Sequence, residues 1–116
     1  MTYGQYIRTA REALRETDRS FSLRQVAMRV GIEPAYLSKI ERGEVAPPSE
    51  ATTRKLAAEL GEDADVLLAM SGKVSSELLA IILKRPQLFA DLLRQLKDAP
   101  DKALLRVVRE VRDGNW

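Results

Sequence analysis

The side chains available for chemistry are a limited set, because the 116-residue chain contains no cysteine and no histidine. Thiol nucleophiles, the usual zinc ligands and the commonest general base are therefore missing. The carboxylates are scattered, and there is no glycine-rich phosphate loop. We therefore expect no enzymatic activity, no metal and no cofactor. What remains is recognition by hydrogen bonding, for which basic and polar side chains alternate between Pro34 and Arg42.

The residues around this segment predict two short helices joined by a tight turn. Ala27 and Gly31 lie four residues apart, which suits a small residue where two helices cross and a glycine in the turn. Apolar residues that would pack the two helices together are Val26, Val30, Ile32, Leu37 and Ile40. The sequence thus predicts a helix-turn-helix over residues 23–42. A plain helical hairpin inside another bundle is the alternative.

Helical spacing of apolar residues recurs along the whole chain and no stretch alternates strictly, so we predict an all-α fold. Five helices are expected before Ser71-Gly72, which divides residues 1–72 from residues 73–116. The predicted helix starts are marked by a capping box of Ser22 with Gln25, by Glu33 with Pro34, by Ser49 and by Asp63.

Leu23 to Gly43, reading LRQVAMRVGIEPAYLSKIERG, resembles the DNA-binding domain of the Cro/C1 family of phage and bacterial repressors, also called the XRE family. The resemblance covers about residues 3 to 70 and is most specific in residues 36–43. It implies a five-helix domain whose third helix lies in the major groove of double-stranded DNA. By position it assigns base contacts to Glu33, Pro34, Ala35, Tyr36, Ser38 and Lys39.

Within that set, Lys39 is the strongest candidate, because a lysine donates to the O6 and N7 atoms of guanine. A solvated surface lysine is the alternative. Relatives often carry glutamine near Pro34 and Ala35, so specificity here shifts to Lys39, Tyr36 and Glu33. Phosphate contacts are expected from Ser22, Arg24, Arg42 and Thr53. The resemblance also implies that Arg11 and Glu41 form a partly buried ion pair with a structural role.

Residues 73–116 contain three apolar stripes separated by Pro86 and Pro100, which predicts about three helices. So short a segment cannot bury all three stripes in a core of its own. A regulator that reads a palindrome needs two copies, so we expect this segment to form a homodimer. Core packing within one chain is the alternative. The expected dimer contacts are Leu78, Leu79, Ile82, Leu88, Phe89, Leu92, Leu93, Leu104 and Val108.

The formal net charge of +2 does not by itself indicate nucleic acid, but its distribution is uneven. Residues 56–72 contain four acidic and no basic residues and separate two basic parts. No run of 18 apolar residues occurs, and Arg8, Arg11 and Glu12 interrupt the region where a signal peptide would be apolar. We therefore expect a cytoplasmic protein, associated with the nucleoid when bound, that makes no membrane contact.

Two functions remain open from the sequence. The first is a homodimeric repressor of a palindromic operator. The second is an antitoxin-like or anti-repressor module whose C-terminal helices bind a partner protein. By analogy with the family, an antagonist protein or a peptidase that acts on the tail is a further partner to consider.

Overall fold

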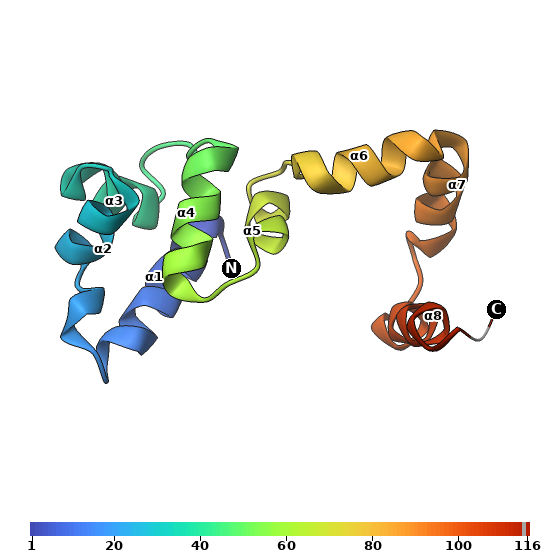
Figure 1. The fold of residues 1–116 in the computed structure, drawn as a ribbon, viewed down its shortest axis with the longest axis horizontal. Coiled ribbons are helices and arrows are strands. Elements are labelled where there is room, and N and C mark those ends of the chain that lie inside the picture. Colours follow the sequence, from blue (N-terminus) through green and yellow to red (C-terminus); the bar gives the residue numbers. More distant parts are fainter. Residues whose placement is uncertain (115) are drawn as a thin grey trace. The chain divides into compact units, whose positions relative to one another are not determined.

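The computed structural model describes residues 1–114 and 116, and these residues form helices without any strand (Figure 1). The all-α prediction is confirmed. The chain divides into two compact units, Met1–Leu78 and Leu79–Trp116, which are described separately. The helices are α1 (Tyr3–Arg15), the short 3-10 helix η1 (Arg19–Phe21), α2 (Leu23–Val30), α3 (Pro34–Glu41), α4 (Glu50–Leu60), α5 (Ala64–Met70), α6 (Ser76–Lys84), α7 (Pro86–Leu96) and α8 (Asp101–Asp113).

The helix starts in the first unit are capped by short polar side chains, as the sequence predicts. The oxygens of Ser22, Ser49 and Asp63 each accept a hydrogen bond from a backbone N–H in the first turn that follows. Ser22 bonds the N–H of Gln25, but the reciprocal half of the expected capping box is not formed. A complete capping box instead joins Thr2 and Gln5 at the start of α1.

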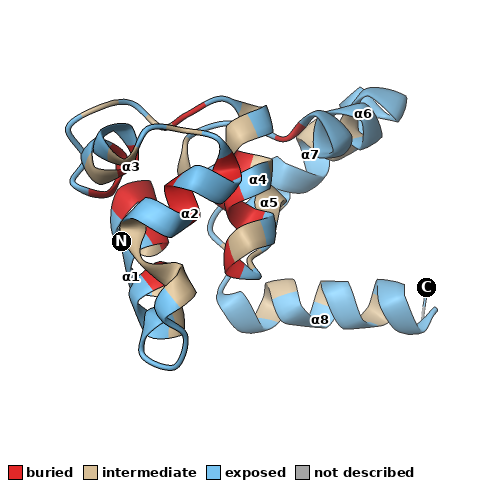
Figure 2. Ribbon diagram, turned by 60° about the vertical axis from the view of Figure 1, so that its left-hand side comes forward, coloured by how far each residue is buried: buried red, intermediate tan, exposed pale blue. Residues whose placement is uncertain are grey.

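The core of the first unit is formed where α1, α2, α3, α4 and α5 meet (Figure 2). Gly4 lets α1 approach the end of α3 closely, because a Cβ atom there would overlap the carbonyl oxygens of Ile40 and Glu41. This close approach holds the end of α3 against α1. The buried apolar side chains are Tyr3, Ile7, Val26, Ala27, Val30, Leu37, Ile40, Leu56, Ala57, Leu60, Leu67 and Leu68.

An arginine on α2 also connects this helix to its neighbours. The Nε atom of Arg29 lies 2.6 Å from Glu59 Oε2 on α4. The same guanidinium lies 5.2 Å from the centre of the Phe21 ring, within the range of a cation–π contact. Part of the acidic charge between residues 56 and 72 therefore serves to hold α2 in place.

The second unit consists of the remainder of α6 with α7 and α8, and none of its described residues is buried (Figure 2). Pro86 occupies the first turn of α7 and Pro100 caps α8, so both prolines separate helices as predicted. Among the residues that the structure describes, no helix is long and apolar enough to span a membrane.

The first unit reaches Leu78, whereas the sequence suggested a division at Gly72. The additional residues pack on this unit because Ser75 is fully buried and Ser76 bonds Glu50 on α4. The helix α6 therefore begins in the first unit and continues into the second.

Candidate nucleic-acid interface

The turn between α2 and α3 has the geometry that the sequence spacing predicts. Ala27 is fully buried, and its carbonyl oxygen accepts hydrogen bonds from the N–H groups of Gly31 and Ile32, at 2.9 and 3.0 Å. Gly31 ends α2 in the left-handed conformation at φ +84°. Leu37 and Ile40 are buried against the core. These contacts fix α3 relative to α2 and leave its opposite side outside the core.

None of the predicted base-reading side chains of α3 belongs to the buried core. Glu33, Ala35, Tyr36 and Lys39 are exposed, and Pro34 and Ser38 are half-buried. Glu33 caps α3 by its backbone, but its carboxylate makes no capping hydrogen bond. No described residue forms an ion pair or side-chain hydrogen bond with Glu33, Tyr36 or Lys39. These three side chains are available to an external ligand.

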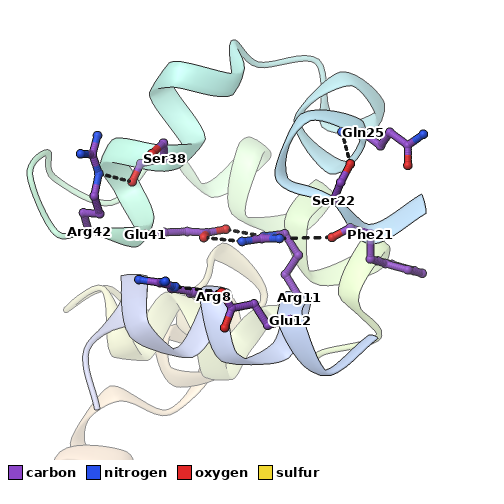
Figure 3. A network of polar contacts seen from close by, with 9 residues as sticks. All are labelled: Arg8, Arg11, Glu12, Phe21, Ser22, Gln25, Ser38, Glu41 and Arg42. Carbon is purple, nitrogen blue, oxygen red and sulfur yellow. Dashed lines mark hydrogen bonds and ion pairs between the residues drawn. The ribbon is translucent and has the colours of Figure 1, made fainter. Parts of the chain in front are cut away.

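The pair of Arg11 and Glu41 joins α1 to the end of α3 (Figure 3). Arg11 Nε donates to Glu41 Oε2 at 2.7 Å, and Nη2 donates to Oε1 at 2.9 Å. The side chains are 5% and 3% exposed. Arg11 Nη1 also donates to the carbonyl oxygen of Phe21 at 3.3 Å. The hydrogen bond with Glu41 raises the pKa of Arg11, and burial opposes this with a smaller effect.

The candidates for phosphate contact at the start of α2 retain free donors. Ser22 is half-buried and its oxygen is occupied by the N–H of Gln25 at 3.3 Å. The N–H groups of Leu23 and Arg24 have no partner among the described residues. Exposed backbone N–H groups at a helix start attract anions, and the guanidinium of Arg24 adds positive charge beside them.

Arg42 is exposed just beyond α3. Its Nε donates to the carbonyl oxygen of Ser38 at 3.3 Å, and its Nη1 lies 3.3 Å from Glu44 Oε1. The side chains of Arg42 and Glu44 are both exposed, so the guanidinium retains further donors for an external anion.

Thr53 requires a correction. The sequence suggested a phosphate contact, but in the structure this side chain on α4 is completely buried. Its hydroxyl and the hydroxyl of Tyr3 form a hydrogen bond of 2.9 Å that joins α4 to α1. Because neither hydroxyl can reach a phosphate from this position, we do not retain Thr53 as a ligand-contacting residue.

Arg8 was missed by sequence reasoning. It lies on α1 one turn before Arg11, and both line a pocket of about 160 Å³ between α1 and α3. Ser38 and Arg42 line the same pocket from the side of α3. Arg8 Nε lies 3.0 Å from Glu12 Oε1, an exposed pair that competes weakly with other anions. The spacing of Arg8 and Arg11 on one helix face was the available signal.

A protein family and a known protein both match the N-terminal part of this chain or most of it. A family model described as a helix-turn-helix domain matches residues 2–70. In Bacillus subtilis (strain 168), an uncharacterized HTH-type transcriptional regulator, RghRB, is 36% identical over 74 residues. The match covers 64% of this chain and 50% of the relative, so the chain spans about half the length of that protein. No solved structure matches the chain.

Proposed function

The chain belongs to the helix-turn-helix domain family, and we propose that it is a DNA-binding transcriptional regulator that acts as a homodimeric repressor of a palindromic operator. The observation that carries the proposal is the outer side of α3, where Tyr36 and Lys39 are exposed and have no partner within the described residues. The name of the Bacillus subtilis relative supports a role in transcriptional regulation.

In this proposal α3 lies in the major groove and reads bases from its exposed side. The ammonium group of Lys39 donates to guanine O6 and N7, and the Tyr36 hydroxyl and the Glu33 carboxylate contact neighbouring base edges. Glu33 accepts the hydrogens of a cytosine amino group. Ser38 and Ala35 provide the remaining short contacts, with the Ala35 methyl suited to a thymine methyl.

Lys39→Ala is expected to weaken binding to the selected operator by about 1 to 3 kcal/mol, which is roughly 5- to 150-fold, because one base contact is lost. Binding to unrelated duplex DNA should change much less. The operator is first obtained by selecting sites from random DNA with the full chain, and affinities are then measured by fluorescence anisotropy. Lys55→Ala, which removes an exposed lysine on α4, is the matched control. Equal affinities for the Lys39 and Lys55 variants would show that α3 does not read bases through Lys39.

We propose that phosphates are held by the free N–H groups at the start of α2, with Arg24, Arg42 and Arg8. These donors come from α1, α2 and the end of α3, so they surround the base-reading side chains on more than one side. Such contacts fix the register of the domain on DNA without reading its sequence.

Arg8→Ala is expected to lower the slope of log K against log salt by about 0.9, because one fewer counterion is released per lost phosphate contact. The loss of affinity should be similar for operator and unrelated duplex DNA. Binding is measured between about 50 and 200 mM salt. Arg106→Ala is the control, because Arg106 makes the same kind of exposed i,i+4 pair, with Glu110 on α8. Identical slopes for Arg8→Ala and the unmodified protein would remove Arg8 from the interface.

The proposed homodimer rests on the apolar side chains of the second unit and the end of the first. Most of the exposed large apolar side chains of the chain lie between Val74 and Val111. We propose that a second copy covers this apolar area, since a standard interface takes about 800 Å² from each partner. A second copy supplies an equal area and brings a second α3 to the same DNA. Two half-sites about 10 to 10.5 base pairs apart are then expected.

The residues of the proposed dimer interface differ in how far they are exposed. Leu78, Leu79, Leu88, Leu92, Leu93 and Val108 are exposed. Ile82, Phe89 and Leu104 are half-buried. Leu88 and Leu92 lie one turn apart on α7, so they present a continuous apolar face.

A further inference from the structure

Two of the arginines proposed to bind phosphate are already paired with carboxylates of the first unit. Arg8 Nε lies 3.0 Å from Glu12 Oε1, and Arg42 Nη1 lies 3.3 Å from Glu44 Oε1. The four side chains are between 49% and 56% exposed. Such exposed pairs contribute little net free energy, so a phosphate can replace either carboxylate. We call these two contacts the exchangeable pairs.

The pair of Arg11 and Glu41 beside them differs in geometry and burial (Figure 3). Two guanidinium nitrogens of Arg11 donate to the two carboxylate oxygens of Glu41, and the side chains are 5% and 3% exposed. Arg8 instead donates a single hydrogen bond to Glu12, through Nε. Breaking a buried pair is costly, whereas an exposed pair is readily broken. Glu41 therefore stays with Arg11 when DNA binds, and Glu12 and Glu44 can be displaced.

Glu12 lies where it also affects an approaching phosphate. It lines the pocket of about 160 Å³ between α1 and α3, together with Arg8 and Arg42. In addition to the hydrogen bond with Glu41, the charge of Glu12 raises the pKa of Arg11. An ionised carboxylate accepts hydrogen bonds and donates none, so it repels a phosphate oxygen. A phosphate that binds Arg8 therefore competes with Glu12 for the same guanidinium.

Arg24 at the start of α2 has no comparable carboxylate beside it. None of the described residues forms an ion pair with Arg24. The proposed phosphate contacts thus differ in their cost. Arg24 is available at once, whereas Arg8 and Arg42 each give up a partner first.

We propose that Glu12 and Glu44 are internal competitors of the DNA backbone, which hold Arg8 and Arg42 in the free protein and lower the affinity for duplex DNA. This inference rests on the proposed function. Because the competition is with phosphates, it acts on DNA of every sequence alike. The base contacts of α3 then account for a larger share of the binding free energy at the operator.

Neutralising either carboxylate is expected to tighten binding to both the operator and unrelated duplex DNA by about 2- to 5-fold, the range of one exposed ion pair. Affinities of Glu12→Gln, Glu44→Gln and the unmodified chain are measured by fluorescence anisotropy at one salt concentration. Both variants are expected to fold, because exposed pairs contribute little to stability.

Glu110→Gln is the matched control, because Glu110 makes the same kind of exposed i,i+4 pair as Glu12, with Arg106 on α8. It should leave both affinities unchanged. Unchanged or weaker binding by the Glu12 or the Glu44 variant overturns the inference for that pair. If the unmodified protein does not bind DNA, the proposed function itself is contradicted instead.

Double variants separate competition for an arginine from simple repulsion of DNA. If Glu12 acts by holding Arg8, Glu12→Gln should give no gain in affinity in the Arg8→Ala background, because the two substitutions are then not additive. The same comparison applies to Glu44→Gln in the Arg42→Ala background. Gains of the same factor with and without the arginine overturn the competition.

Discussion

Glu41→Ala is expected to lower the free energy of unfolding by about 3 to 5 kcal/mol, the largest effect on stability that we predict for one substitution. The variant leaves the Arg11 guanidinium buried without its carboxylate partner. The side chain of Arg11 is 5% exposed. In the variant, the carbonyl oxygen of Phe21 is the one present acceptor that Arg11 retains. Burial of an unpaired charge is far costlier than loss of a surface contact.

Thermal and urea unfolding followed by circular dichroism measure this effect. Glu12→Ala is the matched control, because Glu12 also pairs with an arginine of α1, but its side chain and that of Arg8 are 51% and 56% exposed. An exposed pair of this kind contributes about 0.5 kcal/mol or less. Similar midpoints for the Glu41 and Glu12 variants would contradict a stabilising role of the buried pair.

The local structure of the helix-turn-helix was predictable because it depends on residues close in sequence. Ala27 and Gly31 are four residues apart, and the packing of the crossing and the left-handed turn both follow from their small size. Helix starts at Ser49 and Asp63 were predictable for the same reason, since a cap bonds N–H groups within the next turn. The exposed side of α3 follows once Leu37 and Ile40 are placed in the core.

Residues whose environment depends on distant parts of the chain were harder to place. Thr53 has a polar side chain, which suggested the surface, yet it lies on the same α4 face as Leu56, Ala57 and Leu60. Its burial is possible because Tyr3 provides a hydrogen-bond partner 50 residues away. The pocket beside Arg8 likewise requires α1 to approach α3 at Gly4. Neither contact has a signature in local sequence spacing.

The boundary between the two units was also hard to predict, because it depends on contacts between residues that are distant in sequence. The sequence marks Ser71-Gly72 by its composition, whereas the burial of Ser75 and the hydrogen bonds between Ser76 and Glu50 extend the first unit. Glu50 and Ser76 are 26 residues apart in sequence. The apolar stripes of α7 and α8 were predictable from helical periodicity, but periodicity does not specify what covers them.

Leu88→Lys is expected to convert the proposed dimer to a monomer and to reduce affinity for a two-half-site operator by about 10² to 10⁴-fold, the contribution of linked binding sites. Leu88 is 68% exposed on the apolar face of α7. A lysine there would place a charge on the apolar face of the proposed interface, and charged groups are depleted in the buried part of interfaces. Because α3 is untouched, binding to a single half-site should remain.

Sedimentation equilibrium and DNA titration measure the two consequences in the same preparation. Gln87→Lys is the matched control, since it adds the same charge at the adjacent exposed position on the polar side of α7. If the apolar face of α7 joins two copies, Leu88→Lys sediments as a monomer and Gln87→Lys as a dimer. If both variants remain dimeric, two copies associate elsewhere on the chain and this face of α7 does not form the dimer interface.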